Sequence, residues 1–410
     1  MKRITEIFSL IAIAAALCSC GDDRSSEFYE MTKENQWMYN TMKESYLWGD
    51  SIGEIRQQAF FANTAKFFSQ LTYKTDDTSF FTDSIESTTY GFKFSLMRDP
   101  LGIAPAKVYA LVEYVEPESV AATAGLERGM WISTINGKNI NMGTGAALTD
   151  GAAITLGINQ ILFDDDTEEY MWGDLLQIDM QAASKVKATS LPIVEIINGR
   201  SNRIGYILCN SFDNESAIAG IGDALSTFSS QGVTDIVLDL RYNRSHSLAN
   251  AAKIAAAFMP ADKQGNLFCS LYKDLKLTIK EDVMLPQATA SIGDKPLYII
   301  TTAQTHGTAN ALIKAIRLAR GSSACKIIGE TAKGGNLATE CMESPYRFKI
   351  NPVTAIVIDA NGEPLAPTAP DYRLTEIGDY KHIYPLGDKQ EYILYNIAYI
   401  IENGTLPANK

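Results

Sequence analysis

The chain has 410 residues, of which 46% are hydrophobic and 20% are charged, and its formal net charge at pH 7 is −12. This length and composition predict two or three globular domains with ample core. The acidic balance argues against nucleic acid as a partner and against electrostatic docking on anionic lipid.

The first residues have the pattern of an export signal. Lys2 and Arg3 precede an apolar run over 7–17, which is too short to span a bilayer as a mature helix. The run ends in Leu17-Cys18-Ser19-Cys20, a lipobox pattern. We expect a lipoprotein signal peptide over 1–19, acylation of Cys20 and a solvated tether over 20–27, with an ordinary signal peptide cut nearby as the alternative. The lipid anchor would place the protein in the cell envelope or outer membrane, facing the periplasm or the cell surface.

Residues 28–85 are predicted to form a small N-terminal helical domain. Two segments show apolar and aromatic residues at helical spacing. These residues are Trp37, Met38, Tyr39, Met42, Tyr46, Leu47 and Trp48, then Phe60, Phe61, Phe67, Phe68 and Leu71. Such a face is typical of core, with ligand contact as the alternative.

Residues 86–187 change to short strands and turns. The segments 90–96, 108–115, 117–126 and 129–137 occur in the order and spacing of a PDZ domain, which this part of the chain resembles. A PDZ domain captures an extended peptide by strand addition, and backbone N–H groups of a loop hold its terminal carboxylate. The resemblance places that loop at Tyr90, Gly91, Phe92, Lys93 and Phe94. A PDZ fold that only braces its neighbour remains open.

The acidic run from Asp164 to Glu169 lacks the glycine and spacing of a calcium loop, so we expect a solvated hairpin tip there. We expect no cofactor and no metal. Four cysteines remain after Cys20, namely Cys209, Cys269, Cys325 and Cys341. Their spacing does not indicate a metal site. They could be buried free thiols or, in an exported protein, form disulfides.

Residues 188–404 alternate strands and helices, which predicts an α/β core. Strands are expected over 204–210, 235–240, 297–301 and 326–329, and helices over 217–231, 247–258 and 308–320. The turn between strand 297–301 and helix 308–320 is where an α/β fold would present a nucleophile.

Five segments of this core resemble C-terminal processing peptidases, also called tail-specific proteases, in residues and in order. They are IGYILCNSF (204–212), VTDIVLDLRYN (233–243), TTAQTHGTANALIKAIR (301–317), IIGET (327–331) and APDY (369–372). The likeness covers nearly all of the chain after the signal and is greatest to the lipoprotein members of Bacteroidetes. It implies a multidomain α/β protein, with an N-terminal helical cap, a β-rich PDZ domain and a peptidase core of the ClpP/crotonase-like type. It also implies a Ser nucleophile, a Lys base and unstructured polypeptides or peptide C-termini as partners.

The residues that carry the family's chemistry differ here. The nucleophile position holds Thr308, and the lysine position by loop alignment holds Gly335, although Lys333 lies two residues earlier. The glycines of the oxyanion loop are replaced by Arg244, Ser245 and His246. Backbone N–H groups that donate to the oxyanion stabilise the transition state by roughly 3 kcal/mol each. The nucleophile, the base and the oxyanion loop all differ from the family pattern, which indicates that the protein no longer catalyses hydrolysis.

Three hypotheses follow. The first is a degenerate family member that binds peptide C-termini, and the second is an active endopeptidase that uses Thr308 and Lys333. The third is an occluded PDZ groove in a protein that binds no peptide. A triad of Thr308, His306 and Glu330 is a further, less favourable option, and Thr308 could simply be the helix N-cap.

Overall fold

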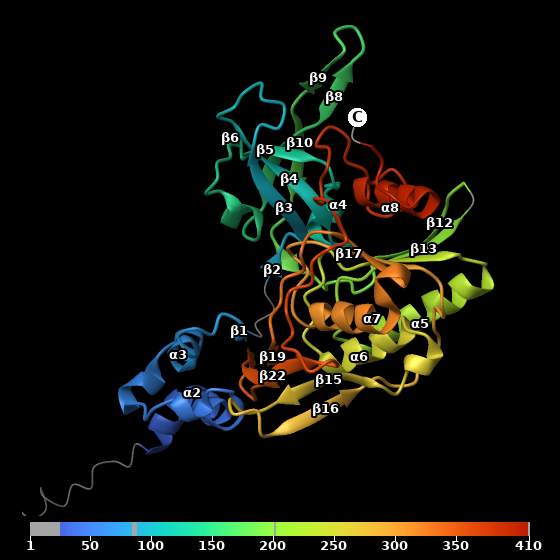
Figure 1. The fold of residues 1–410 in the computed structure, drawn as a ribbon. Helices are drawn as coiled ribbons and strands as arrows, with labels where there is room; N and C mark the ends of the chain where they lie inside the picture. Colours follow the sequence, from blue (N-terminus) through green and yellow to red (C-terminus); the bar gives the residue numbers. More distant parts are fainter. Residues whose placement is uncertain (1–24, 84–87, 201, 409–410) are drawn as a thin grey trace, which may run out of the picture. The chain divides into compact units, whose positions relative to one another are not determined.

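The computed structural model describes residues 25–83, 88–200 and 202–408. The signal peptide and the acylated Cys20 expected from the sequence lie outside these residues. Within them, no helix has the length and apolar character needed to cross a bilayer. The chain divides into two compact units, drawn in Figure 1. One unit is Met1–Asp83 with Met342–Pro352, and the other is Ser84–Cys341 with Val353–Lys410.

The first unit combines helices with a small sheet. Its helices are α2 (Ser25–Ser45) and α3 (Thr64–Leu71), with the short 3-10 turns η1 (Gly49–Ser51) and η2 (Gln57–Phe61). The predicted aromatic face is largely core, since Met38, Met42, Phe67 and Phe68 are buried, whereas Phe61 is 51% exposed. The sheet has the order β1 (Phe80–Asp83), β21 (Phe348–Asn351) and β20 (Met342–Glu343). The sequence did not predict this sheet, because β1 pairs with β21, which comes more than 250 residues later.

The predicted β-rich region contains a six-stranded antiparallel sheet with the order β10-β7-β5-β4-β3, in which β6 pairs with β5. We call it the antiparallel sheet. Its strands are β3 (Phe92–Arg98), β4 (Val108–Val115), β5 (Trp131–Ile135), β6 (Lys138–Asn139), β7 (Ile154–Asn159) and β10 (Leu176–Met180). The short helix α4 (Val120–Thr123) begins at Ser119, whose hydroxyl oxygen accepts the N–H of Ala122 at 3.0 Å. The strands β8 (Ile161–Asp164) and β9 (Glu169–Trp172) pair as a hairpin, so the acidic run is a hairpin tip as predicted.

The α/β region is built on a second sheet, the mixed sheet, with the order β12-β13-β14-β17-β18-β23. Every neighbouring pair is parallel except β12 with β13. Its strands are β12 (Ile193–Asn198), β13 (Arg203–Leu208), β14 (Asp235–Asp239), β17 (Leu297–Thr301), β18 (Cys325–Gly329) and β23 (Tyr372–Arg373). The predicted strands of this region are therefore confirmed to within two residues at most of their ends.

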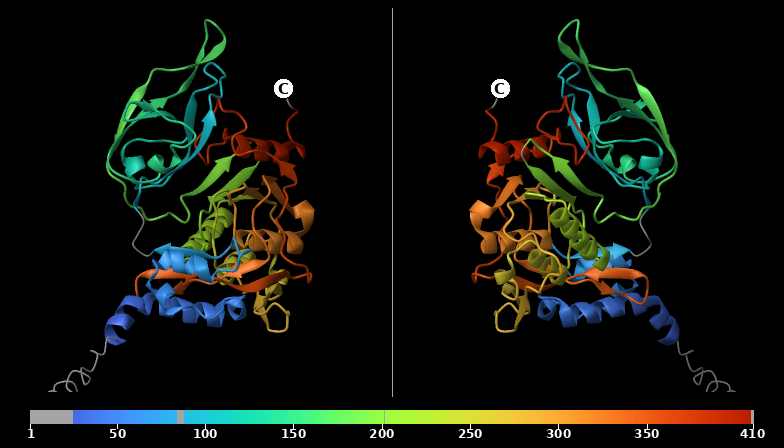
Figure 2. Two further views of the ribbon diagram at one scale, coloured as in Figure 1. Left: turned by 90° about the vertical axis from the view of Figure 1, so that its left-hand side faces the viewer. Right: turned by 90° about the vertical axis from the view of Figure 1, so that its right-hand side faces the viewer.

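Both faces of the mixed sheet are buried, as expected for a parallel sheet. The helices α5 (Glu215–Ser230), α6 (Leu248–Ala257) and α7 (Thr308–Ala324) cover one face, where Leu238 and Ile299 join their core. The helix α8 (Tyr392–Asn403) covers the other face, where Val237 and Ile300 join a separate core. Figure 2 shows α8 and α5 on opposite sides of this sheet. Alternate residues of each strand thus enter different cores.

A four-stranded sheet with the order β16-β15-β22-β19 completes the α/β region. Its strands are β16 (Lys280–Met284), β15 (Leu267–Tyr272), β22 (Val353–Asp359) and β19 (Leu337–Thr339). The remaining short elements are β2 (Thr88–Thr89), paired with β11 (Ser184–Lys185), and the 3-10 turns η3 (Gly145–Leu148) and η4 (Ala261–Lys263). The thiols of Cys209, Cys269 and Cys325 are buried in the core, while Cys341 is exposed.

Candidate functional site

The turn between β17 and α7 is fastened to the end of β14. The hydroxyl of Thr305 donates to the carbonyl of Leu240 at 2.8 Å and accepts the N–H of Thr302 at 3.0 Å. The hydroxyl of Thr302 donates to the carbonyl of Arg241 at 2.5 Å. Both threonines are buried. The start of α7 therefore lies at the carboxyl edge of the mixed sheet, beside the loop that follows β14, where an α/β fold binds ligands.

The loop after β14 uses its own backbone donors internally. The N–H of Ser245 donates to Oδ1 of Asn243 at 3.1 Å. The N–H groups of His246 and Ser247 donate to Oδ1 of Asp213 at 2.8 and 2.9 Å. The hydroxyl oxygen of the buried Ser245 accepts the N–H of Phe212 at 2.9 Å. An oxyanion hole needs donors that point at the substrate, and these three N–H groups point into the chain.

Thr308 is held by the same loop. Its backbone N–H and its hydroxyl both donate to the carbonyl oxygen of Ser245, each at 2.9 Å. This oxygen lies against the first turn of α7, where the N–H groups and the helix dipole favour an anion. A carbonyl cannot take the hydroxyl proton, so this hydrogen bond does not activate Thr308. The N-cap of α7 is Gly307, so the assignment of Thr308 as N-cap was wrong and Thr308 is the first helical residue.

Gly307 makes this arrangement possible. Its φ is +69°, and a Cβ added there would lie 2.5 Å from the carbonyl oxygen of Ser245. Only glycine combines a positive φ with such close backbone approach without strain. The turn and the loop after β14 are therefore fitted to each other at this residue.

The backbone of Lys333 is near the turn, but its side chain is exposed. Its N–H donates to the carbonyl of Thr305 at 2.8 Å, and the neighbouring Gly334 would contact Asn310 if it carried a Cβ. Within the described ranges, the amine of Lys333 makes no hydrogen bond or ion pair. A general-base lysine must lie within hydrogen-bond reach of the hydroxyl that it deprotonates, and the exposed amine of Lys333 has no hydrogen bond to Thr308 among the described residues.

Asn310, two residues after Thr308, has a structural role. Asn310 is fully buried, its Nδ2 donates to the carbonyl of Ala366 at 2.9 Å, and its Oδ1 accepts the N–H of Thr368 at 3.1 Å. The alternative triad is not assembled either. The hydroxyl of Thr308 is bound to Ser245, and Oε2 of Glu330 accepts the N–H of Ala303 at 3.2 Å.

The two histidines of the site differ in environment. His246 is half-buried, and burial lowers the pKa of its imidazole, while the charge of Asp213 acts in the opposite direction. His306 is exposed, and its N–H donates to the carbonyl of Asn243 at 2.8 Å. Among the described residues, no cluster of three or more His, Cys, Asp or Glu side chains is arranged to hold a metal.

The loop that resembles a carboxylate-binding loop also uses its donors within the chain. The N–H of Tyr90 donates to the carbonyl of Thr149 at 3.1 Å, and the N–H of Gly91 donates to Oγ1 of Thr89 at 3.1 Å. Gly91 has φ +85°, and a Cβ there would lie 2.3 Å from Cβ of Ser119. The following strand β3, which contains Phe92 and Phe94, is an edge strand of the antiparallel sheet, so strand addition is open to it.

Lys93 connects the antiparallel sheet with the loop after β14. It lies opposite Tyr114 in the pairing of β3 with β4, and its Nζ lies 5.0 Å from the ring centroid of Tyr242. This distance is within the range of a cation–π contact. Burial lowers the pKa of Lys93, and the charge of Arg244 lowers it further. The predicted peptide loop and the loop after β14 are thus brought together where Lys93 lies over the ring of Tyr242.

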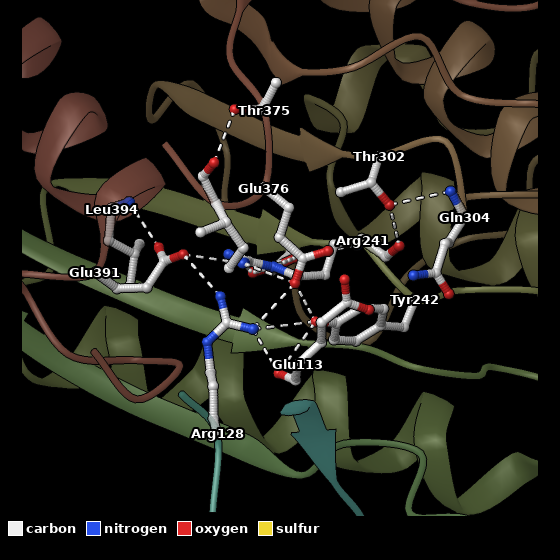
Figure 3. A network of polar contacts seen from close by, with 12 residues as sticks. Glu113, Arg128, Arg241, Tyr242, Thr302, Gln304, Thr375, Glu376, Glu391 and Leu394 are labelled. Carbon is white, nitrogen blue, oxygen red and sulfur yellow. Dashed lines mark hydrogen bonds and ion pairs between the residues drawn. The ribbon is translucent and has the colours of Figure 1, made fainter. Parts of the chain in front are cut away.

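A buried charge network, shown in Figure 3, adds residues that the sequence did not single out. The guanidinium of Arg128 donates to Glu376 at 3.0 Å, to the hydroxyl of Tyr242 at 3.3 Å and to the carbonyls of Glu113 and Tyr384. The hydroxyl of Tyr242 also donates to Glu376. The network therefore ties the antiparallel sheet to the mixed sheet and to the segment before α8.

The same network continues at Arg241, which is fully buried. Its guanidinium forms ion pairs with Asp239 at 2.8 Å and with Glu391 at 3.0 Å. The hydrogen bond from the N–H of Leu394 to Glu391 joins the network to the first turn of α8. Asp239 is the last residue of the buried strand β14 and Arg241 lies two residues later. Charged residues at the end of a buried strand are a recognisable signal for a site, whereas nothing near Arg128 marks its role.

Comparisons with known proteins agree with this architecture. Residues 203–374 match the model described as "Peptidase family S41", and residues 33–95 match the "Peptidase S41 N-terminal domain". No curated protein sequence matches the chain.

Solved structures are similar in fold. A putative S41 protease from Bacteroides fragilis NCTC 9343 has 24% identity and a TM-score of 0.76, over 90% of this chain and 97% of that one. Mature CPAF has 10% identity and a TM-score of 0.50, over 93% and 100% of the two chains. The photosystem II D1 C-terminal processing protease has 15% identity and a TM-score of 0.49, over 84% and 93%. The first two structures indicate a shared fold, and identities this low indicate nothing finer. With the two family matches, however, the chain is a homologue of the S41 peptidases and carries their N-terminal and peptidase domains.

Proposed function

We propose that this S41 homologue is catalytically degenerate and acts by binding peptide C-termini at the cell envelope. The observation that carries the proposal is the carbonyl oxygen of Ser245, which accepts both the N–H and the hydroxyl of Thr308. The position from which a nucleophile would attack is therefore bonded to a group that cannot act as a base.

The neighbouring groups support the same conclusion. The backbone donors of Ser245, His246 and Ser247 are bound within the chain, and the side chain of Lys333 is exposed. Nucleophile, base and oxyanion donors act as one unit in covalent hydrolysis. Three unfavourable arrangements at one site leave little of the rate enhancement that such a unit provides.

Peptide binding is supported by the region that resembles a PDZ domain. The strand β3 is an edge strand, so an extended peptide can pair with it through backbone hydrogen bonds. The turn η3 lies beside that edge, since a Cβ added at Gly145 would lie 3.8 Å from Leu96, and it forms a short wall because it spans only Gly145–Leu148. A peptide would therefore be held mainly by its backbone and its terminus.

The test is cleavage of casein, a disordered substrate, by the full-length chain purified in mild detergent. We expect no cleavage by the wild type, and we expect none after Thr308→Ser, because the new hydroxyl would meet the same Ser245 carbonyl. Measurable wild-type cleavage that is lost in both Thr308→Ala and Lys333→Ala would overturn the proposal and establish the alternative, an endopeptidase that uses these two residues.

The envelope location rests on the lipobox pattern that ends in Cys20. Whole-protein mass spectrometry of the chain expressed in a Gram-negative host should show loss of residues 1–19 and addition of acyl chains. Cys20→Ala should abolish the acyl mass. An unacylated wild-type chain would contradict the anchor and leave the proposal of peptide binding unaffected.

A further inference from the structure

The hairpin of β8 and β9 presents an apolar face to solvent. Leu162 and Met171 lie opposite one another in the pairing of the two strands, so their side chains share a face, and they are 49% and 46% exposed. The face that carries Tyr170 is occupied. Its hydroxyl lies 3.0 Å from Nε2 of His382, and the ammonium of Lys381 lies 4.5 Å from its ring centroid. The hairpin is therefore held from one side and leaves the other side open to a partner.

The tip of the same hairpin is acidic. Its exposed carboxylates are those of Asp165, Asp166, Glu168 and Glu169. Within the ranges that the structure describes, none of these four side chains forms an ion pair. An exposed apolar face beside unpaired carboxylates fits a partner surface that is both apolar and basic.

The loop between β15 and β16 has this complementary character. Leu275, Leu277 and Ile279 are exposed within five residues of one another, Ile279 by 60%. Lys276 lies among them and is also exposed. In the described part of the chain its ammonium forms no ion pair, so an apolar loop carries a cation that is available to a partner.

This loop is ordered by an acid of its own. The carboxylate of Asp274 accepts the N–H groups of Thr278 at 2.8 Å and of Ile279 at 2.7 Å, so it is turned into the loop. The two lysines that flank the loop are paired with acids of β16, at 3.0 and 2.8 Å. Lys276 is thus the charge that remains for a partner. An ordered loop loses little conformational entropy when a partner covers it.

The hairpin and the loop belong to the same compact unit, and Figure 1 shows them at opposite ends of it. They therefore do not cover each other within one chain. If two copies met hairpin to hairpin, their acidic tips would repel, and a contact of loop with loop would oppose two lysines. Hairpin against loop brings Lys276 to the carboxylates and covers apolar side chains on both sides.

We propose that the β8–β9 hairpin of one copy of this chain docks on the β15–β16 loop of a second copy. The contact is head-to-tail, so each bound copy keeps one free surface, and association continues into rings or filaments. Few side chains take part on each side, which is typical of a weak and transient interface. This association does not depend on peptide binding, because neither surface includes β3.

Sedimentation velocity of the full-length chain in a density-matched mild detergent, at up to about 0.5 mM protein, measures the association. The hairpin variant carries Leu162→Thr and Met171→Thr, since Thr suits a strand. The loop variant carries Leu277→Asn and Ile279→Thr, since Asn tolerates the φ of +56° at position 277. We expect the wild type to associate beyond the dimer and each variant to self-associate at least about tenfold more weakly.

A mixture of the two variants tests the head-to-tail geometry. The loop variant keeps an intact hairpin and the hairpin variant keeps an intact loop, so the mixture should form dimers with one copy of each and nothing larger. The matched control is Tyr395→Gln, because Tyr395 is also large and 52% exposed but lies on α8, outside both surfaces. It should associate as the wild type does. Circular dichroism melts establish that each variant is folded.

Cross-linking identifies the contact itself. A carbodiimide joins an amine to a carboxylate that it touches, so Lys276 should be linked to an acid of residues 164–169. In a mixture of isotopically light and heavy chains, the link should join light to heavy, both in detergent and in phosphatidylcholine vesicles. Either variant associating alone as tightly as the wild type would overturn the proposal in favour of a self-pairing contact. A monomeric wild type without a light-to-heavy link in either medium would overturn it outright.

Discussion

Asp371 shows how one side chain holds the edge of the mixed sheet to α7. Its carboxylate forms a two-point ion pair with Arg317, with one contact at 2.5 Å, and accepts the N–H of Ile327 at 2.8 Å. Arg317 also donates to the carbonyl of Cys325. A single carboxylate therefore connects α7, β18 and the segment before β23.

This carboxylate predicts a specific acid sensitivity. Burial raises the pKa of Asp371, but its bonds to Arg317 and Ile327 lower the pKa by more, so the pKa in the folded chain lies below its usual value. A lowered pKa contributes stability that is present above the unfolded value, near pH 4, and is lost as the pH falls through the folded pKa. Because the pair is partly exposed, solvent screening keeps the expected contribution at about 1 kcal/mol.

The measurement is the urea midpoint of Asp371→Asn and wild type from pH 7 down to pH 2. The variant should be less stable at pH 7, and the difference should shrink as the pH falls below about 4 and through the lowered folded pKa, after which both carry a neutral side chain. Asp282→Asn is the control, since Asp282 also has a lowered pKa but lies in an exposed pair with Lys280. A difference between Asp371→Asn and wild type that stays constant with pH would contradict the electrostatic account.

The candidate site shows what residue-level reasoning can and cannot reach. Replacement of the nucleophile, base and oxyanion positions was readable at Thr308, Lys333 and the loop 244–246. The hydrogen bond from the Thr308 hydroxyl to the carbonyl of Ser245 could not be predicted from the sequence, because it depends on how the turn before α7 packs against the loop after β14. Lys93 was assigned to a peptide loop, while its contact with the ring of Tyr242 depends on the packing of two sheets.

At the scale of elements, the start of α7 depends on a fit between two loops. Gly307 has a positive φ and approaches the carbonyl oxygen of Ser245 so closely that a Cβ would lie 2.5 Å away. The variant Gly307→Ala should therefore be destabilised in two ways, by the positive φ and by the clash of its Cβ with the carbonyl oxygen of Ser245. We expect it to lower the free energy of unfolding by about 3 kcal/mol.

Gly232 offers a matched comparison. Its φ of +66° is nearly the same, but a Cβ there would meet nothing within 4 Å. Gly232→Ala should cost only the backbone term, about 1 kcal/mol. Urea unfolding of both variants measures the difference, and equal losses would show that the loop after β14 moves aside without cost.

The strands and helices of the α/β region were predictable because their apolar patterns are strong. Strands such as Leu297–Thr301 are buried on both faces and appear as continuous apolar runs. The strand β1 was not predicted, because its identity depends on pairing with β21 more than 250 residues later. The predicted end of the helix at Arg320 coincides with the break at Gly321, with φ +73°, whereas the helical residues after it up to Ala324 were not predicted.

At the scale of the whole molecule, Arg128 is the main polar connection between the antiparallel sheet and the mixed sheet. Its side chain is 7% exposed and bonds to the carbonyl of Glu113 on β4, to Tyr242 after β14 and to Glu376 before α8. It also donates to the carbonyl of Tyr384 at 3.2 Å. One residue of the turn between α4 and β5 thus has partners in three separate segments of the chain.

Replacing Arg128 by methionine should make the antiparallel sheet and the mixed sheet unfold less cooperatively. The variant keeps the apolar stem but leaves Glu376 and Glu391 with one fewer positive charge, and removing one member of a buried ion pair costs about 3–5 kcal/mol. We expect calorimetry to resolve two transitions where the wild type has one, because the antiparallel sheet would lose its polar connection to the rest. Lys253→Met is the control, since its ion pair with Glu215 is exposed and its loss should change stability by less than about 1 kcal/mol. If Arg128→Met still unfolds in a single transition with stability close to wild type, apolar packing and not the charge network joins the two sheets.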